Sequence, residues 1–359
     1  MPDISALADR YDELKAERLP KIEAFMRGDV PYLVCLPSPT TMYGNCNSIE
    51  DSFAANLYDF EQGLDIATDG LPYLEPWFGT GAYAEAFGCE YFWRDGESPA
   101  CHYKYHSLDE VKDLEKPDIR KARVLNMVLD AIAHFREKTE DRLPLVLTDT
   151  QSAHDTATMV LDACEVFVAS YEAPEALHAF LSIINELIIE FSRLQADLIG
   201  PTLLSRPGHI MACSHTGGPG ISISEDNIMV ASPYVNEHFL LPYTNAVGAA
   251  FGGVAIHSCG CWTHSMAITR KMENVMMIDC AVGLGSDPNP NAPEDVREAM
   301  LDSGIIVSAR CGSDLKRVLD TLDRLAGPGI RLVVRMGCTP ENSQARYDAI
   351  SRKLEDLYS

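Results

Sequence analysis

The chain has 359 residues, of which 46% are hydrophobic, so it is long enough to bury a large core. Its formal net charge of -24 argues against nucleic acid and anionic membranes as partners, because both reward clustered Lys and Arg. The 11 cysteines are scattered along the chain, unlike those of a small disulfide scaffold. No apolar run reaches membrane-spanning length and the segment after Met1 is polar, so we expect a cytoplasmic protein.

Short apolar runs alternate with helix-like segments along the chain. After a helix over residues 4–27, the predicted strands are 32–36, 70–74, 143–148, 209–213, 254–257, 275–280, 304–308 and 330–334. The helices predicted between and after them are 48–67, 107–114, 117–138, 152–170, 174–199, 224–229, 232–251, one from 262, 294–301, 313–326 and 339–357. The aromatic and Gly-rich segment 75–99 is expected to be a long loop that covers a pocket.

This alternation predicts the α/β class with a parallel sheet. Eight strand–helix units favour a single (β/α)8 TIM barrel over residues 31–359, preceded by an N-terminal helical extension over residues 1–30. An open, doubly wound sheet is the alternative. It is disfavoured because no glycine-rich dinucleotide fingerprint follows the first predicted strand.

The strand predicted from Val254 ends in a pattern typical of metal ligands. His257, Cys259 and Cys261 follow one another at every second position. Alternate residues of an extended chain point to the same side, so His257 and Cys259 would present an imidazole and a thiolate together. Such a pair suits zinc, and three protein ligands would leave one position open for catalysis. A structural site closed by Cys261 is the alternative, and His257 could also be a core histidine.

The third ligand is predicted from the fold. Chemistry in a TIM barrel takes place at the C-terminal ends of the strands, and Cys338 follows the last predicted strand. Gly337 allows a sharp turn there, and Thr339 is a candidate N-cap of the next helix. A thiol at a helix N-terminus has a lowered pKa, and the thiolate is the form that binds metal. Cys338 is therefore the predicted third ligand, with Cys280 and Cys311 as the next candidates.

Three further residues are candidate substrate contacts: Asp149, His215 and Glu225. The strand-end rule selects Asp149 and His215, whereas Glu225 lies in the helix predicted over 224–229. Asp149 could instead cap the helix that follows it, and His215 could be an ordinary residue of its Gly-rich loop.

The pattern His257-x-Cys259-Gly, followed much later by Gly337-Cys338, resembles the uroporphyrinogen decarboxylase superfamily. Within it, the chain resembles the corrinoid-dependent methyltransferase branch of the methylcobamide:coenzyme M type. Segments 84–90, 107–114 and 240–243 also read like parts of this family. One departure is that no arginine lies between Arg27 and Arg94, where the decarboxylases hold a substrate with many carboxylates. This disfavours porphyrinogen as the substrate.

The resemblance implies a zinc-dependent methyltransferase with His257, Cys259 and Cys338 as catalytic metal ligands. Its other cofactor would be a methylated corrinoid (methylcobamide) supplied by a partner corrinoid protein, and the acceptor would be a small-molecule thiol bound to zinc. A homodimer is compatible with this reading. Two alternatives remain: a metal-free decarboxylase-like enzyme acting on another carboxylic acid, and a non-catalytic zinc-binding barrel.

Overall fold

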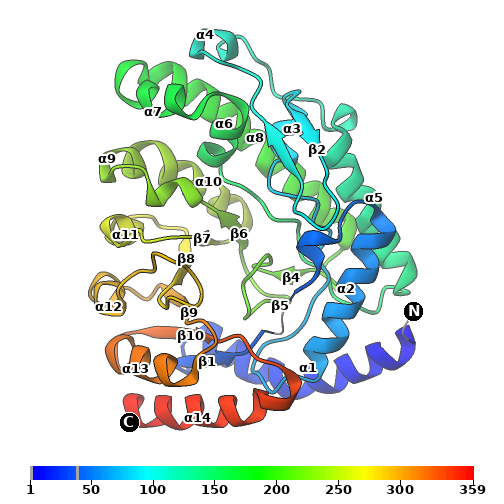
Figure 1. The fold of residues 1–359 in the computed structure, drawn as a ribbon, viewed down its shortest axis with the longest axis vertical. Helices are drawn as coiled ribbons and strands as arrows, with labels where there is room; N and C mark the ends of the chain where they lie inside the picture. The colour runs from blue at the N-terminus through cyan, green and yellow to red at the C-terminus, as the bar shows by residue number, and fades with distance from the viewer. Residues whose placement is uncertain (1–2, 38–39) are drawn as a thin grey trace.

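The computed structural model describes residues 3–37 and 40–359 and has an α/β fold organised around one parallel sheet (Figure 1). The six strands lie in the order β1-β10-β9-β8-β7-β6, and every neighbouring pair is parallel. Their bounds are β1 Tyr32–Cys35, β6 Ile221–Ser224, β7 Val254–Ser258, β8 Val275–Ala281, β9 Ile306–Arg310 and β10 Arg331–Arg335. Nearly all of their residues are buried, as expected for a parallel sheet covered by helices.

β1 and β6 are the two edge strands of the sheet, and irregular segments lie between them. Leu74 forms an isolated parallel bridge with Leu145, and Gln151 forms another with Ser224 of β6. These contacts give the molecule a TIM-barrel-like form, which confirms the predicted fold class. The expected strand 70–74 contributes one isolated bridge and 143–148 contributes two, both through Leu145. Neither forms a longer ladder because each contains a proline, which has no N–H to donate.

Helices surround the sheet, and Figure 1 shows α7, α9, α11 and α12 along one side. The helices are α1 Ile4–Arg27, α2 Ile49–Leu64, α3 Ala82–Ala86, α4 Leu108–Val111, α5 Arg123–Lys138, α6 Ala153–Val160, α7 Ala163–Glu172, α8 Pro174–Ile199, α9 Pro233–Val235, α10 Leu241–Phe251, α11 Thr263–Thr269, α12 Pro293–Met300, α13 Leu315–Leu325 and α14 Pro340–Tyr358. Shorter helical turns are η1 Met42–Gly44, η2 Ile119–Lys121, η3 Asp226–Met229 and η4 Asn236–Leu240. Two small antiparallel pairs complete the fold: β2 Glu90–Phe92 with β3 Ala100–His102, and β4 Ser205–Arg206 with β5 His215–Thr216. None of the described helices is long and apolar enough to cross a membrane.

The predicted strand 209–213 is wrong. This segment turns instead, with Ile210 at a φ of 58°. The Ser214 hydroxyl holds the turn through hydrogen bonds to the Met211 carbonyl oxygen at 2.6 Å and the Gly208 N–H at 3.0 Å. The strand lies later, at β6, where Ile and Ser alternate and do not form the continuous apolar run that is typical of a buried strand.

Two predicted helices also differ from the structure. The helix expected over 152–170 is divided into α6 and α7, because the Asp162 carboxylate caps α7 by accepting the Cys164 N–H at 2.9 Å. The helix expected over 224–229 is the short turn η3, since Ser224 belongs to β6.

A buried carboxylate joins the two ends of the chain. Asp69 is 5% exposed and accepts hydrogen bonds from the Val34 N–H at 2.7 Å, Lys21 Nζ at 2.8 Å and the Tyr347 hydroxyl at 2.7 Å. These partners lie on β1, α1 and α14. The Asp69 N–H also donates to the Val34 carbonyl oxygen at 2.8 Å, so this residue connects the 70–74 segment to β1.

We expect Asp69→Ala to lower the free energy of unfolding by about 2–4 kcal/mol, because three donors lose a buried charged acceptor. The matched control is Asp65→Ala, which removes a carboxylate paired with Arg10 at 2.5 Å on the surface, where the side chains are 44% and 50% exposed. That change should cost at most about 1 kcal/mol. Denaturant unfolding of both variants measures the difference, and equal losses would contradict the role given to Asp69.

Candidate metal centre

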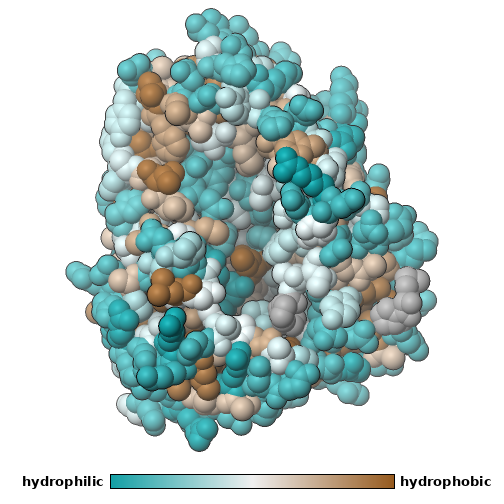
Figure 2. Space-filling model, in the orientation of Figure 1, coloured by the Kyte–Doolittle hydropathy of each residue, from teal (hydrophilic) through white to brown (hydrophobic). Residues whose placement is uncertain are grey.

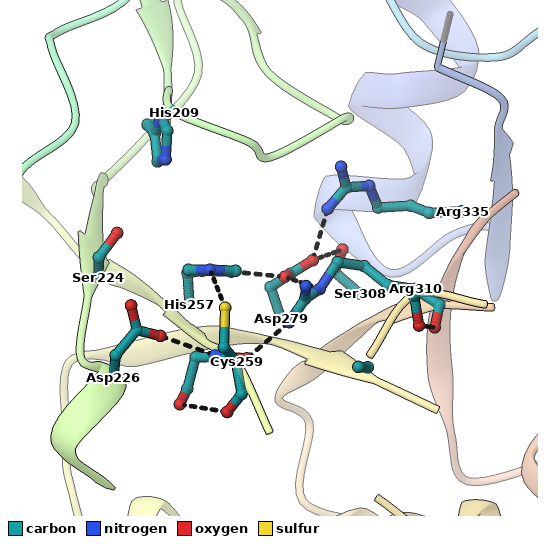
Figure 3. A network of polar contacts seen from close by, with 12 residues as sticks. His209, Ser224, Asp226, His257, Cys259, Asp279, Ser308, Arg310 and Arg335 are labelled. Carbon is teal, nitrogen blue, oxygen red and sulfur yellow. Dashed lines mark hydrogen bonds and ion pairs between the residues drawn. The ribbon is translucent and has the colours of Figure 1, made fainter. Parts of the chain in front are cut away.

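Three possible metal ligands lie together at the C-terminal ends of adjacent strands. They are Asp226, two residues after the end of β6, His257 in β7 and Cys259, directly after β7 (Figure 3). One ligand atom from each lies within 4.8 Å of the other two. The combination of carboxylate, imidazole and thiol suits a borderline-soft divalent cation such as zinc. The structure therefore brings together the predicted His257–Cys259 pair and adds Asp226 to it.

His257 is oriented by Asp279 of β8. The strand register places the two residues opposite each other, and His257 Nδ1 lies 2.8 Å from Asp279 Oδ1. The other ring nitrogen, Nε2, lies 3.7 Å from Cys259 Sγ. A carboxylate that accepts the Nδ1–H leaves the Nε2 lone pair free for a metal, which is the usual arrangement behind a histidine ligand.

Asp279 is fully buried and has several partners besides His257. Ser308 Oγ donates to it at 2.7 Å, Arg335 Nη1 donates at 2.8 Å, and Arg310 Nε forms an ion pair with it at 2.9 Å. Burial alone would raise the pKa of Asp279, but the Arg335 and Arg310 guanidiniums outweigh it and hold this pKa well below its usual range. Asp279 is therefore ionised at neutral pH and accepts the His257 proton.

Cys259 is half-buried, and its backbone N–H donates to Asp226 Oδ1 at 2.7 Å. Burial and the nearby Asp226 carboxylate raise the pKa of the Cys259 thiol to about 11. The thiol is therefore protonated at neutral pH when no cation is close. Binding of a metal there would release a proton, since the thiolate is the ligand form.

Asp226 is held from behind by a second carboxylate. The Asp155 side chain accepts the N–H groups of Asp226 at 2.5 Å and Asn227 at 2.9 Å, which are the first residues of η3. Because the Asp226 backbone is fixed in this way, its carboxylate is directed toward Cys259.

A second polar cluster lies beside His257. His209 Nδ1 is 2.7 Å from Glu75 Oε1, its Nε2 is 3.6 Å from Asp149 Oδ1, and its ring centroid is 6.5 Å from that of His257. Burial lowers the pKa of His209, but the Asp149 and Glu75 carboxylates outweigh it and raise this pKa to about 9. A buried imidazolium therefore lies next to the candidate metal group at neutral pH.

A cavity of about 440 Å³ adjoins the second cluster and the Asp279 network. Glu75 of the second cluster and Arg335, the partner of Asp279, both line it. Its walls are otherwise mainly apolar and aromatic, and include Leu36, Met42, Tyr43, Phe60, Leu71 and Tyr73. The volume suits a small organic molecule, and the cavity is linked to His257 through Arg335 and Asp279.

Cys338, the predicted third ligand, is not part of the group of three. It is buried, and its Sγ lies 3.8 Å from the Pro37 carbonyl oxygen. The expected low pKa of this thiol is wrong, because burial raises its pKa to about 11. The other two candidates, Cys280 and Cys311, are buried thiols outside the group, and burial raises the pKa of both.

The three predicted substrate contacts have different surroundings. Asp149 lies in the second cluster, where it also accepts hydrogen bonds from Ser224 Oγ at 2.7 Å and Gln151 Nε2 at 2.9 Å. His215 lies in β5, before β6 begins, and therefore toward the opposite end of the sheet from Asp226. Glu225 is fully buried and accepts hydrogen bonds from the Ser152 and Thr244 hydroxyls, both at 2.6 Å.

Sequence reasoning missed Asp226, Glu75 and His209. Asp226 follows β6, so recognising the Ile-Ser alternation as a strand would have selected it by the same strand-end rule. Glu75 and His209 lie in irregular segments, and no local pattern identifies them.

Substituting Asp279 should weaken metal binding. In Asp279→Asn the uncharged side chain no longer holds the His257 tautomer by charge, and we expect the affinity for Zn²⁺ to fall about 10- to 100-fold. Chelator competition measures this, with circular dichroism to confirm the fold. Ser308→Ala is the matched control, because it removes one neutral donor from the same carboxylate. If Asp279→Asn binds Zn²⁺ at least as tightly as Ser308→Ala does, the charge of Asp279 is not what orients His257.

Glu225 should make stability depend on pH. Burial raises its pKa to about 7, although the Ser152 and Thr244 hydroxyls, both at 2.6 Å, oppose this shift. The folded state then binds more protons than the unfolded state between about pH 4.5 and about pH 7, so this contribution to stability falls as pH rises. Glu225→Gln cannot ionise and should gain stability relative to wild type between about pH 5 and about pH 8, measured by denaturant unfolding. Exposed Glu172→Gln is the control; a relative loss in Glu225→Gln would refute the assignment.

Comparisons with known proteins agree with this architecture. Residues 78–200 match the family model described as uroporphyrinogen decarboxylase (URO-D). The fold is similar to that of a methyltransferase from Methanosarcina mazei, with 15% identity, a TM-score of 0.63, and coverage of 94% of this chain and 97% of that chain. A structure described as "a putative dehydratase" from Mesorhizobium loti is 10% identical over 87% of this chain and 56% of that chain, with a TM-score of 0.40. No curated protein matches the sequence. Residues 78–200 therefore resemble the uroporphyrinogen decarboxylase family, and the chain as a whole has a fold similar to that of the methyltransferase.

Proposed function

We propose that this protein is a zinc-dependent methyltransferase that moves a methyl group from a methylated corrinoid, carried by a partner protein, to a small thiol. The observation that carries the proposal is the group formed by Asp226, His257 and Cys259, with His257 oriented by the ionised Asp279. The similarity in fold to a methyltransferase supports the reaction type.

The donor set fits zinc. One imidazole nitrogen, one thiol and one carboxylate converge, and Asp279 keeps the Nδ1–H of His257 away from the ligand position. When bound there, zinc would lower the pKa of an acceptor thiol so that it reacts as a thiolate at neutral pH.

The protein would supply position and charge for the transfer. The cavity beside Glu75 and Arg335 has room for the body of a small thiol. In the transfer, the thiolate sulfur forms a bond to the methyl carbon while the cobalt–carbon bond breaks. Both electrons of that bond stay on the corrinoid, so the products are a thioether and cob(I)amide. The buried His209 imidazolium lies close enough to His257 to stabilise negative charge near the reacting sulfur.

The third ligand has two candidates. Asp226 is supported by its distance to His257 and Cys259, and Cys338 is supported by the family resemblance.

Zinc content per chain distinguishes these candidates. We expect about one zinc per chain in wild type, which a catalytic site with three protein ligands binds tightly, and a large loss in Cys259→Ser. Asp226→Asn and Cys338→Ser then show which residue is the third ligand. The matched control is Cys164→Ser, because Cys164 is an exposed cysteine outside the site. A wild type without zinc, or full zinc in Cys259→Ser, would exclude the proposed centre.

A second experiment tests the reaction itself. The zinc-loaded protein is mixed with free methylcobalamin and each member of a panel of small thiols, and formation of cob(I)alamin is followed by absorbance. Transfer should require both zinc and a thiol, and should be lost in Cys259→Ser. Turnover that is independent of added thiol would contradict the proposal.

One observation favours a second candidate, a decarboxylase-like enzyme without metal. The URO-D family match lies over residues 78–200, which do not include the candidate metal ligands. This alternative predicts release of CO₂ from a carboxylic acid by metal-free protein, and full activity in Cys259→Ser.

A further inference from the structure

Four exposed apolar or aromatic side chains form one surface, which we call the α7–α9 patch. They are Val168, Tyr171, Val230 and Tyr234, with exposed fractions of 47%, 61%, 64% and 45%. Figure 2 shows apolar surface over α7 and α9, on the face that has the central hollow. Large side chains exposed together in this way are typical of an interaction surface.

Contacts within the patch make it continuous. Val168 and Tyr171 lie three residues apart on α7 and therefore share a face. The Tyr171 and Tyr234 rings stack with centroids 5.4 Å apart, and the Tyr171 hydroxyl lies 2.8 Å from Ser232 Oγ. Val230 lies two residues before Ser232. The two tyrosines are thereby held in place before any partner arrives, which lowers the entropy cost of binding.

The patch is directly connected to the candidate metal centre. The turn η3 begins at the candidate ligand Asp226 and ends at Met229, next to Val230 of the patch. Met229 also packs against Gly260, where a Cβ would lie 2.5 Å from the methionine sulfur. A protein bound to the patch would therefore lie next to η3, the turn that begins at the candidate ligand Asp226.

The charges around the patch define the partner. Residues 143–192 and 207–269, which include α7, η3 and α9, contain no Lys or Arg. Acidic side chains border the patch on the α7 side, namely Glu165, Glu172 and Glu175, of which the last two are exposed. A second copy of this chain would bring the same acidic border against it and is disfavoured by repulsion. A partner with an apolar centre bordered by Lys and Arg is complementary.

We propose that the α7–α9 patch is the docking surface for the corrinoid-carrying protein, and that the contact face of that protein is apolar with a basic border. This inference rests on the proposed function for the identity of the partner. Its evidence is the exposed aromatic pair, the continuity of the patch with η3 and the absence of Lys and Arg from residues 143–192 and 207–269.

The test measures binding of the corrinoid protein from the same organism, purified and loaded with methylcobalamin, to the full chain. We expect Val168→Glu and Tyr171→Ala each to weaken binding about tenfold or more, as substitutions at the centre of an interface do. Glu172→Lys should also weaken it, because it repels a basic border. The matched control is Tyr58→Ala, since Tyr58 is 53% exposed on α2, outside the patch.

Methyl transfer from free methylcobalamin is the second readout. It needs no docking, so all four variants should retain the wild-type rate, which also shows that they are folded. The proposal is overturned if Val168→Glu and Tyr171→Ala bind the corrinoid protein with the same affinity as Tyr58→Ala, or if Glu172→Lys binds it more tightly than wild type. It is also overturned if sedimentation experiments show a dimer of this chain that dissociates in the patch variants.

The two proposals fail in different ways. If wild type binds the corrinoid protein through the patch but methylates no thiol, the proposed function is wrong and the docking surface stands. If wild type methylates a thiol from free methylcobalamin and the patch variants bind the corrinoid protein normally, the docking surface is wrong and the function stands.

Discussion

The site depends on one buried charge, the Asp279 carboxylate. The strand register places His257, Asp279 and Ser308 side by side on β7, β8 and β9, while Arg310 and Arg335 reach the same carboxylate from the ends of β9 and β10. Such a charge is costly to bury unless every partner is present. The parallel sheet supplies them from three neighbouring strands, so the fold and the orientation of His257 are determined by the same contacts.

The two polar clusters carry opposite charge balances. Asp279 is surrounded by two guanidiniums, whereas the His209 imidazolium lies between the Glu75 and Asp149 carboxylates. The cavity touches both clusters. A molecule bound there would meet a cationic side and an anionic side around an apolar space, which orients it before any chemistry begins.

The fold class and the His257–Cys259 pair could be predicted from the sequence because both depend on local patterns: alternating elements, and two ligands on one strand. Asp226 could not be predicted in this way. The strand before it, β6, alternates Ile and Ser, so no continuous apolar run marks where that strand ends. Glu75 and His209 are 134 positions apart and meet only in the folded chain. The environment of Cys338 also depends on tertiary structure, since burial outweighs the effect of the helix N-terminus on its thiol.

The contrast between the inner and outer charges has a consequence for how the protein responds to salt. The Asp279 network is shielded from solvent, so dissolved ions barely screen it, whereas the acidic border of the α7–α9 patch is exposed to them. Ionic strength would therefore act on the encounter with a partner and leave the orientation of the His257 ring unchanged. The salt concentration in the cell would therefore set the rate at which a partner protein associates, while the electrostatic environment of His257 stays the same.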